Sequence, residues 1–222
     1  MKILLVGYGK MGKAIEQVAL QRGHTIAGRV DVGDTDTIAA GADVAIEFSQ
    51  PGAAFDNIAK CLAAGIPVVC GTTGWLDQLD EVKDLVKTYD GTFFYASNYS
   101  LGVNIFFKVN EYLAKLMANQ QNYEISIDET HHTQKKDAPS GTAITLRDGI
   151  AKYNSTKPIP INSFRVDPAP GTHNVKYKSA IDDIEIIHTA HSRDGFALGA
   201  VLVAEWLKGR KGVLTMNDFL PF

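Results

Sequence analysis

The sequence has little cysteine, no long apolar run and no large excess of one charge. Its two cysteines, Cys61 and Cys70, stand in apolar stretches without neighbouring cations, which favours buried thiols in a reducing cytosol over a disulfide framework. The apolar run after Lys2 ends within four residues at a glycine, too short for a secretion signal, and no stretch reaches membrane-spanning length. The net charge of −3 argues against nucleic acid. We therefore expect a cytoplasmic protein with neither membrane nor nucleic-acid partners.

The first hundred residues alternate short apolar segments with segments of helical period. The chain of 222 residues, 45% hydrophobic and 21% charged, has an ordinary globular composition. The expected strands are 2–7, 24–31, 43–48, 66–71 and 92–97, and the expected helices are 11–22, 51–64 and 76–87. Because the strands are almost continuously apolar and alternate with helices, the pattern predicts an α/β domain with a parallel sheet covered on both faces.

The second half of the chain has a different pattern. Helices are expected over 103–118 and 142–153, a half-exposed strand over 123–130, and strands over 163–166, 173–180 and 184–191. The last three strands follow one another without an intervening helix, which predicts antiparallel pairing in an α+β second domain. A final helix over 196–207 is apolar on most sides and is expected to be buried.

A glycine-rich motif, "VGYGKMG", directly follows the first expected strand. Gly7, Gly9 and Gly12 have the G-x-G-x-x-G spacing of a Rossmann dinucleotide-binding loop, in which they allow a tight turn, a close approach to pyrophosphate and helix–strand packing. Asp31 ends the second strand, where this fold needs a carboxylate for the adenine ribose. Asp31 would repel a 2′-phosphate and so favours NADH over NADPH, although nearby Arg29 reduces that repulsion. The alternative is a simple turn with a surface acid.

Three further stretches, "FSQPG", "GTTGW" and "ASNYS", end expected strands at the carboxyl edge of the sheet, where ligands bind in doubly wound folds. Each is also compatible with an ordinary turn. The small side chains and free amides of "GTTG" suit a nicotinamide carboxamide. The resulting candidate cofactor-binding residues are Gly7, Gly9, Lys10, Met11, Gly12, Asp31, Phe48, Ser49, Gly71, Thr72, Thr73, Ser97, Asn98 and Tyr99.

The stretch "DETHHTQKKDAPSGTA", residues 128–143, concentrates polar groups between a strand and a helix. His131 and His132 end the strand, Lys135 follows, and Ser140 occupies the N-cap position of the helix. Free helix amides and nearby cations predict a carboxylate or phosphate site in which histidine or lysine supplies a proton. Taken singly, the features are also compatible with a helix cap and solvated lysines.

We expect no metal site, because no cysteine or close carboxylate completes a ligand set with the two adjacent histidines. Three other histidines, His173, His188 and His191, fall in the expected antiparallel strands. Their positions are compatible either with a face of the sheet or with the site.

The motif "ETHHTQKKDAPSGTA" resembles the signature of the dihydrodipicolinate reductase (4-hydroxy-tetrahydrodipicolinate reductase) family, roughly E-x-H-H-x-x-K-x-D-A-P-S-G-T-A. Matches along the chain are "GKMG", "GTTG", "SNYSLGVN", "SFRV", "GTH" and "HTAHSRDGFALGAVLVAEWLKGRKG". The resemblance implies a Rossmann domain of residues 1–101 plus 194–222 and a domain of residues 102–193 for substrate binding and oligomerisation. The second domain is expected to be built on a mixed or antiparallel open sheet that assembles a homotetramer.

The same resemblance implies reduction of a cyclic imine dicarboxylate by NADH or NADPH, in the diaminopimelate route to lysine. His131 and Lys135 are then the candidate proton donors. The candidate carboxylate-binding residues are His132, Ser140, Gly141, Thr142 and Thr73. Two other classes of function remain open: another small NAD(P)-dependent dehydrogenase, of the aspartate or diaminopimelate dehydrogenase type, and a non-catalytic nicotinamide-sensing regulator.

The chain departs from the family pattern on the adenine side of the cofactor site. The segment between Asp31 and Ala42 is shorter than in fuller-length members, so the chain resembles a short form that lacks a flap. Tyr8 stands where many members have glycine, and Val32 where some have an arginine suited to NADPH. The choice between NADH and NADPH therefore stays open, with Asp31 favouring NADH.

Overall fold

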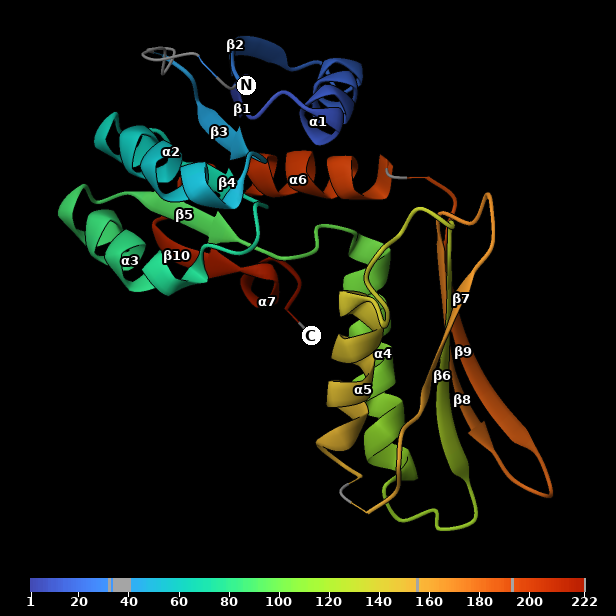
Figure 1. Ribbon diagram of the computed structural model, residues 1–222. Helices are drawn as coiled ribbons and strands as arrows, with labels where there is room; N and C mark the ends of the chain where they lie inside the picture. The colour runs from blue at the N-terminus through green and yellow to red at the C-terminus, as the bar shows by residue number, and fades with distance from the viewer. Residues whose placement is uncertain (32, 34–40, 155, 193, 222) are drawn as a thin grey trace. The chain divides into compact units, whose positions relative to one another are not determined.

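The computed structural model describes residues 1–31, 33, 41–154, 156–192 and 194–221. The chain divides into two compact units (Figure 1). Unit 1 comprises Met1–Leu101 and Asp194–Phe222, and unit 2 comprises Gly102–Arg193. Within the described residues, no helix is both long enough and apolar enough to cross a membrane.

Unit 1 is built on a parallel sheet with the strand order β10-β5-β4-β3-β1-β2. The strands are β1 (Lys2–Val6), β2 (Thr25–Val30), β3 (Val44–Glu47), β4 (Val68–Cys70), β5 (Thr92–Tyr95) and β10 (Gly212–Thr215). The predicted parallel sheet is confirmed. The edge strand β10 was not predicted, because its sequence "GVLT" is short and only half apolar.

Helices cover both faces of this sheet because successive strand residues point to opposite sides. Ile3 and Leu5 pack with α1 (Lys10–Gln21) and α6 (Asp194–Trp206). Leu4 and Val6 pack with α2 (Pro51–Ala63) and α3 (Leu79–Thr88), which lie side by side in Figure 1. The short helices η1 (Leu76–Gln78) and α7 (Met216–Phe219) complete the unit. Helix α6 is buried in its middle, where Ala197, Ala200 and Val203 belong to the core, whereas Leu198 is 38% exposed, so the burial that its apolar sequence predicted holds for part of the helix.

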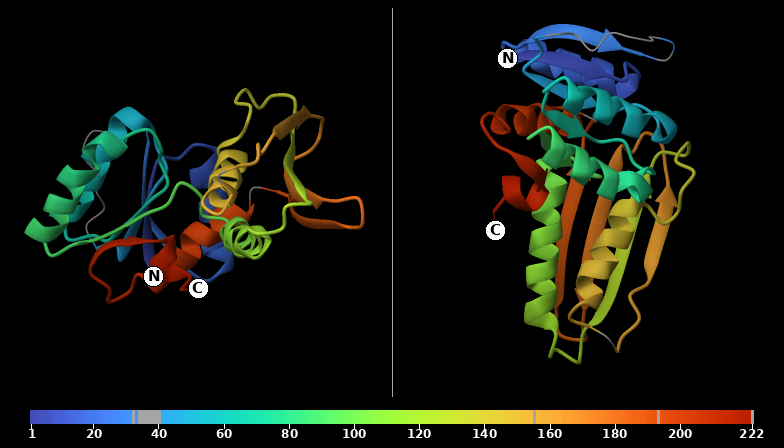
Figure 2. Two further views of the ribbon diagram at one scale, coloured as in Figure 1. Left: turned by 90° about the horizontal axis from the view of Figure 1, so that it is seen from below. Right: turned by 90° about the vertical axis from the view of Figure 1, so that its left-hand side faces the viewer.

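Unit 2 has a four-stranded sheet with the order β7-β6-β8-β9. Its elements are α4 (Leu101–Met117), β6 (Glu124–His131), α5 (Gly141–Ala151), β7 (Ile161–Arg165), β8 (Gly171–Lys178) and β9 (Asp183–Ala190). Helices α4 and α5 lie next to each other on one face of the sheet (Figure 2).

The antiparallel pairing expected for all three late strands is wrong for β7. Strand β8 pairs antiparallel with β6 and β9, whereas β7 pairs parallel with β6. The reason is that α5 lies between β6 and β7 in the chain and carries it back along the sheet, a connection that gives parallel pairing. The sheet is therefore mixed, which is one of the two forms predicted.

Strand alternation places polar groups among the apolar residues that face α4 and α5. On β6 the buried residues are Ile125, Ile127, Glu129 and His131, and on β8 they include His173. The inward face is thus apolar along most of its length and becomes polar where β6 ends and β8 begins. That end of the sheet also lies next to the start of α5, where Ser140 contacts Glu129 and His173.

Candidate functional site

The glycine loop of unit 1 packs too closely to admit side chains at two of its three glycines. Gly7 has a φ of +91°, and a Cβ there would lie 2.0 Å from the Phe48 carbonyl oxygen. A Cβ at Gly12 would lie 2.2 Å from the Gly7 carbonyl oxygen. Gly9, directly before α1, has open space where its Cβ would be. The loop therefore leaves the amino end of α1 open to an anion, with Lys10 exposed beside it.

On the adenine side, Arg29 is already engaged with other side chains. Its Nε donates to Glu16 at 3.0 Å, and its guanidinium lies 5.4 Å from the centre of the Tyr8 ring. The hydrogen bond from Arg29 lowers the pKa of Glu16. Asp31 follows β2 directly and is exposed. Val32 and most of the short segment that follows lie outside the described residues.

The loops after β3 and β4 contact each other at the carboxyl edge of the sheet. A Cβ on Gly71 would lie 2.2 Å from the Phe48 ring, and Ser49 N–H donates to Thr72 Oγ1 at 2.8 Å. Thr73, the next residue, is exposed. Sheet order reverses between β1 and β3, so these loops and the glycine loop flank the switch point where dinucleotides bind in such sheets.

Three other candidate cofactor-binding residues follow β5 in the chain, and their side chains differ in how accessible they are to a ligand. Ser97 is exposed, and the side chain of Asn98 accepts the Ser100 N–H at 2.9 Å. The Tyr99 side chain is buried and donates its hydroxyl to the Cys70 carbonyl at 2.7 Å. The Tyr99 side chain is therefore a core group and is not available to a cofactor.

In unit 2 the carboxylate of Glu129 is the centre of a buried polar cluster. It is 0% exposed, and it accepts Ser140 N–H at 3.1 Å and Arg165 Nη2–H at 3.2 Å. His131 Nδ1 lies 3.5 Å from Glu129 Oε2. Burial alone would raise the pKa of Glu129, but the hydrogen bonds from Ser140, Ser163 and Arg165 together lower it. The carboxylate is thus held in its charged form.

Arg165, on β7, holds the loop that carries Lys135. Its Nε donates to the Lys135 carbonyl at 3.2 Å and its Nη2 donates to the Asp137 carbonyl at 2.5 Å. The Lys135 ammonium pairs with both carboxylate oxygens of Asp137 at 2.8 Å. His132 is half-buried, and its carbonyl accepts the Lys135 N–H at 3.1 Å. The loop backbone is therefore anchored, while the two charged side chains reach its surface.

Ser140 is the N-cap of α5, as the sequence predicted. Its Oγ accepts the Ala143 N–H at 3.2 Å and lies 3.1 Å from His173 Nε2. The serine is buried, so its hydroxyl contacts groups inside the protein, namely the Ala143 N–H and the His173 ring. Gly141 and Thr142 are the first residues of α5, whose amides have no partner within the helix. These two amides are the donors that the helix presents to an anion.

His173 joins the cluster from β8. Its ring centre lies 5.0 Å from that of His131, and its Nε2 lies 3.8 Å from Glu129 Oε2. Burial lowers the pKa of His173 to about 4, and burial also lowers the pKa of His131. His188 instead packs beside Phe106, with ring centres 5.8 Å apart.

Sequence reasoning missed Arg165 and Asp137 as site residues, treated Glu129 only as part of a motif, and left His173 undecided. The signal for Glu129 and His131 was their spacing of two on a strand, which puts both side chains on one face. Arg165 carried no such signal, because its strand pairs with β6 only in the folded chain.

Glu129, His131 and His173 each bring a possible metal-ligand atom within 4.8 Å of the others. The expectation that no carboxylate lies close to the histidines is therefore wrong, because Glu129 lies beside His131 and His173 in the folded chain. However, Glu129 already accepts hydrogen bonds from Ser140 and Arg165. A cation there would have to share the carboxylate with the Arg165 guanidinium, and the contacts that the structure shows for this cluster are hydrogen bonds.

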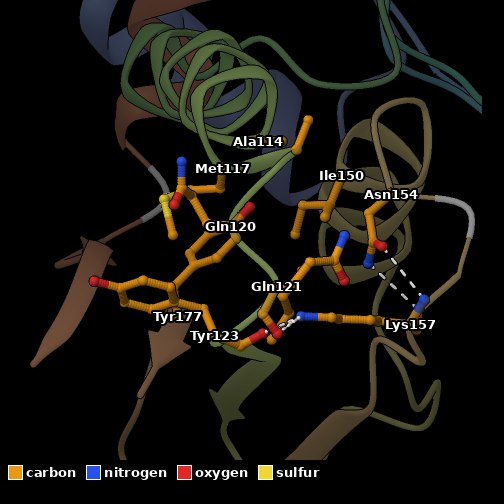
Figure 3. A pocket seen from close by; sticks show the side chains of 11 residues that line it. Ala114, Met117, Gln120, Gln121, Tyr123, Ile150, Asn154, Lys157 and Tyr177 are labelled. Carbon is orange, nitrogen blue, oxygen red and sulfur yellow. Dashed lines mark hydrogen bonds between the residues drawn. The ribbon is translucent and has the colours of Figure 1, made fainter. Parts of the chain in front are cut away.

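A hollow in unit 2 is lined by residues at the carboxyl ends of α4 and α5 (Figure 3). The Glu129 cluster, in contrast, lies at the start of α5. The Lys157 ammonium spans the hollow to the carbonyls of Gln121 and Tyr123, at 2.5 and 2.9 Å. Its lining residues are Ala114, Met117, Ala118, Gln120, Gln121, Tyr123, Ile125, Ile150, Asn154, Lys157 and Tyr177. None of the candidate site residues lines it.

A doubly wound sheet with a glycine loop at its switch point, followed in the chain by an α+β unit with a buried His–Glu cluster, is typical of two-domain nicotinamide-dependent oxidoreductases. Family models described as "Dihydrodipicolinate reductase, N-terminus" and "Dihydrodipicolinate reductase, C-terminus" match residues 1–99 and 102–220. The chain belongs to the dihydrodipicolinate reductase family.

Curated relatives agree with this assignment. The chain is 48% identical to a 4-hydroxy-tetrahydrodipicolinate reductase of Christiangramia forsetii, covering 99% of this chain and 98% of that protein. It is 34% identical to the enzyme of that name from Desulfovibrio desulfuricans, covering 94% of each.

Solved structures share the fold. A dipicolinate-bound dihydrodipicolinate reductase from Paenisporosarcina sp. TG-14 superposes with a TM-score of 0.81 at 20% identity, covering 99% of each chain. An aspartate dehydrogenase from Thermotoga maritima gives a TM-score of 0.52 at 12% identity, covering 95% of this chain and 97% of that one.

Proposed function

We propose that the chain is a 4-hydroxy-tetrahydrodipicolinate reductase, which reduces a cyclic imine dicarboxylate with NAD(P)H to tetrahydrodipicolinate in the diaminopimelate route to lysine. The observation that carries the proposal is the Glu129 cluster, which holds an anion-binding helix end and the Lys135 loop at one end of the unit 2 sheet. Unit 1 is assigned to the dinucleotide and unit 2 to the substrate.

In this proposal the amino end of α5 binds a ring carboxylate. The amides of Gly141 and Thr142 donate to it and the helix dipole favours its charge, while His132 and Lys135 lie on the preceding loop. Thr73 stands in unit 1 after the Gly71–Thr72 turn and is assigned to the carboxylates through the family pattern. Charge compensation and orientation are then the main contributions of the protein.

The reduction needs one hydride and one proton. The substrate would lose its 4-hydroxyl as water. The glycine loop and the loops after β3 and β4 would hold the reduced nicotinamide cofactor, which when bound would supply the hydride for C4 of the resulting conjugated ring. A proton must then reach the adjacent ring carbon. Burial lowers the pKa of His131, so its imidazole is neutral near pH 7 and is a poor proton source. We assign proton delivery to the Lys135 ammonium, with His131 as a relay or positioning group.

Replacing Lys135 with methionine tests this assignment. Methionine keeps the stem of the side chain but removes the proton and the pairing with Asp137. We expect kcat to fall by about a hundredfold or more, the usual contribution of a general acid. The NADH affinity of unit 1 should stay within twofold. Unchanged turnover would remove Lys135 from the mechanism.

Steady-state assays with enzymatically generated substrate, run in parallel with NADH and NADPH, test the reaction and the cofactor together. We propose that NADH is preferred, because Asp31 repels a 2′-phosphate and the nearby cation Arg29 is tied to Glu16. Asp31→Asn should then move the ratio of kcat/KM values toward NADPH. Oxidation of NADH with oxaloacetate and ammonia, but not with this substrate, would indicate an amino-acid dehydrogenase instead.

We also propose that unit 2 assembles the chain into a homotetramer through the outer face of its sheet. Helices α4 and α5 pack on the inner face. On the outer face Phe164, on the edge strand β7, is 49% exposed, and Ile187, on the opposite edge strand β9, is 58% exposed. Contact with other copies of the chain across this face would bury both apolar side chains. Light scattering after size exclusion should give four times the chain mass. A monomer at micromolar concentration would contradict this proposal.

A further inference from the structure

Glu47 is a buried acid in unit 1 that takes no part in the chemistry described so far. It is the last residue of β3, an interior strand between β1 and β4, and it is 0% exposed. Moving a carboxylate out of water is strongly unfavourable unless hydrogen bonds replace the lost hydration. An acid at the end of a core strand therefore calls for specific partners.

The partners of Glu47 come from two neighbouring strand ends. Oε1 accepts the Ser49 N–H at 3.1 Å and also the Ser49 hydroxyl. Oε2 lies 3.1 Å from Cys70 Sγ. The pKa of the Cys70 thiol is raised, mainly by burial and also by the nearby Glu47 carboxylate. The sulfur therefore keeps its proton and acts as the donor. One carboxylate thus joins the ends of β3 and β4.

These bonds also join the two loops that follow β3 and β4. The Ser49 N–H is shared with Thr72 Oγ1 at 2.8 Å, and Gly71 N–H donates to the Glu47 carbonyl at 2.9 Å. The Phe48 ring occupies the space that a side chain at Gly71 would need. The two loops therefore form one hydrogen-bonded and packed unit above Glu47.

We propose that Glu47 is a positioning residue for the nicotinamide end of the cofactor. The carboxylate holds the loops Phe48–Ser49 and Gly71–Thr72 in a single arrangement at the switch point of the sheet, and a binding surface depends on such support from the groups behind it. The inference rests on the proposed function, because the loops meet a nicotinamide only if the chain binds that cofactor. Glu47 itself is buried and acts through the loops.

The test compares two substitutions of Glu47 with one control. Glu47→Met keeps the approximate volume and removes both acceptors. Glu47→Gln keeps one oxygen for Ser49, while its amide group faces the weak acceptor sulfur of Cys70. Cys61→Ala is the control, because Cys61 is buried in the same core cluster as Cys70 but lies outside the Glu47 hydrogen bonds. It reports the effect of core destabilisation alone.

Dissociation constants are measured for NADH and for ADP-ribose, which lacks the nicotinamide ring. We expect Glu47→Met to weaken NADH binding about tenfold and to leave ADP-ribose binding within twofold. Glu47→Gln should recover NADH affinity to within threefold of the wild type. The KM for NADH should follow the same order, and the KM for the dicarboxylate substrate should stay within twofold. Cys61→Ala should lower the melting temperature and leave both affinities unchanged.

Selective loss of NADH affinity in Glu47→Met, with recovery in Glu47→Gln, supports the inference. Equal losses for NADH and ADP-ribose, or unchanged NADH affinity in Glu47→Met, overturn it. If Glu47→Met does not fold, Glu47→Asp replaces it, because the shorter side chain withdraws the carboxylate from Ser49 and Cys70; the same selective loss is expected. A wild-type protein that binds neither ligand would refute the proposed function itself, which is a distinguishable result.

Discussion

Replacing Glu129 with glutamine perturbs the group around which the unit 2 site is built. The carboxylate is fully buried and accepts hydrogen bonds from Ser140 N–H at 3.1 Å and from Arg165 at 3.2 Å, one on each oxygen. Glutamine keeps the shape and one oxygen. It removes the charge and directs an NH2 group at one of these two donors, so one hydrogen bond is lost and the other becomes weaker.

The magnitude follows from those two bonds. A hydrogen bond to a charged group contributes about 1.5–3 kcal/mol and a neutral one about 0.5–1.5 kcal/mol. Arg165 keeps 20% of its side chain exposed and can recover water, which limits the penalty for its lost partner. We expect Glu129→Gln to lower the free energy of unfolding by about 3 kcal/mol. For a chain of this length that corresponds to a fall in melting temperature of roughly 6–12 °C.

Urea denaturation, thermal melting and steady-state kinetics measure the effect. The KM for the dicarboxylate should rise, because Arg165 and Ser140 no longer hold the Lys135 loop and the start of α5 in place. NADH affinity should not change. The matched control is Glu111→Gln, since Glu111 lies on helix α4, away from the outer face of the sheet, and accepts a bond from the exposed Lys152. If Glu129→Gln stays within about 0.5 kcal/mol of the wild type with an unchanged KM, the central role of Glu129 is refuted.

Two further predictions concern the acid stability of unit 2 and the glycine loop of unit 1. The pKa of His173 is about 4 in the folded protein and near 6.5 in the unfolded chain. Its contribution to the free energy of unfolding is therefore complete above pH 6.5 and falls by roughly 3 kcal/mol as the pH drops to about 4. The urea midpoint should depend less steeply on pH in His173→Gln than in the wild type. Gly12→Ala should cost about 1–3 kcal/mol and weaken NADH binding, because its Cβ would meet the Gly7 carbonyl at 2.2 Å. Gly52→Ala, which meets no atom within 4 Å, is the control and should be neutral or stabilising in calorimetry.

Local patterns in the sequence predicted most of the elements and the parallel sheet of unit 1. Apolar runs with glycine or proline at their ends specify the strands and helices of unit 1, and the cap at Ser140 marks the start of α5. The antiparallel pairing expected for β7 failed, because strand direction depends on how the connection crosses the sheet and not on the strand's own residues. Strand β10 was missed because four residues carry too little periodicity to stand out.

The candidate site, too, could be predicted from the sequence only in part. The motif of residues 128–143 marked the strand end, the cationic loop and the capped helix, since these features are adjacent in the chain. Long-range pairing then brought Arg165 and His173 to Glu129, from strands that lie on either side of β6. No local pattern identifies such partners.

By itself the sequence determined most of the elements, the dinucleotide loop and the family, because each is encoded by residues close together in the chain. Only the tertiary structure decided which polar groups are buried and what they contact. It made Glu129 the centre of the unit 2 cluster, placed His173 beside His131, and enclosed Glu47 beneath the loops after β3 and β4. The physical reason is that burial and hydrogen bonding depend on pairing between distant segments, which the order of residues along one segment does not contain.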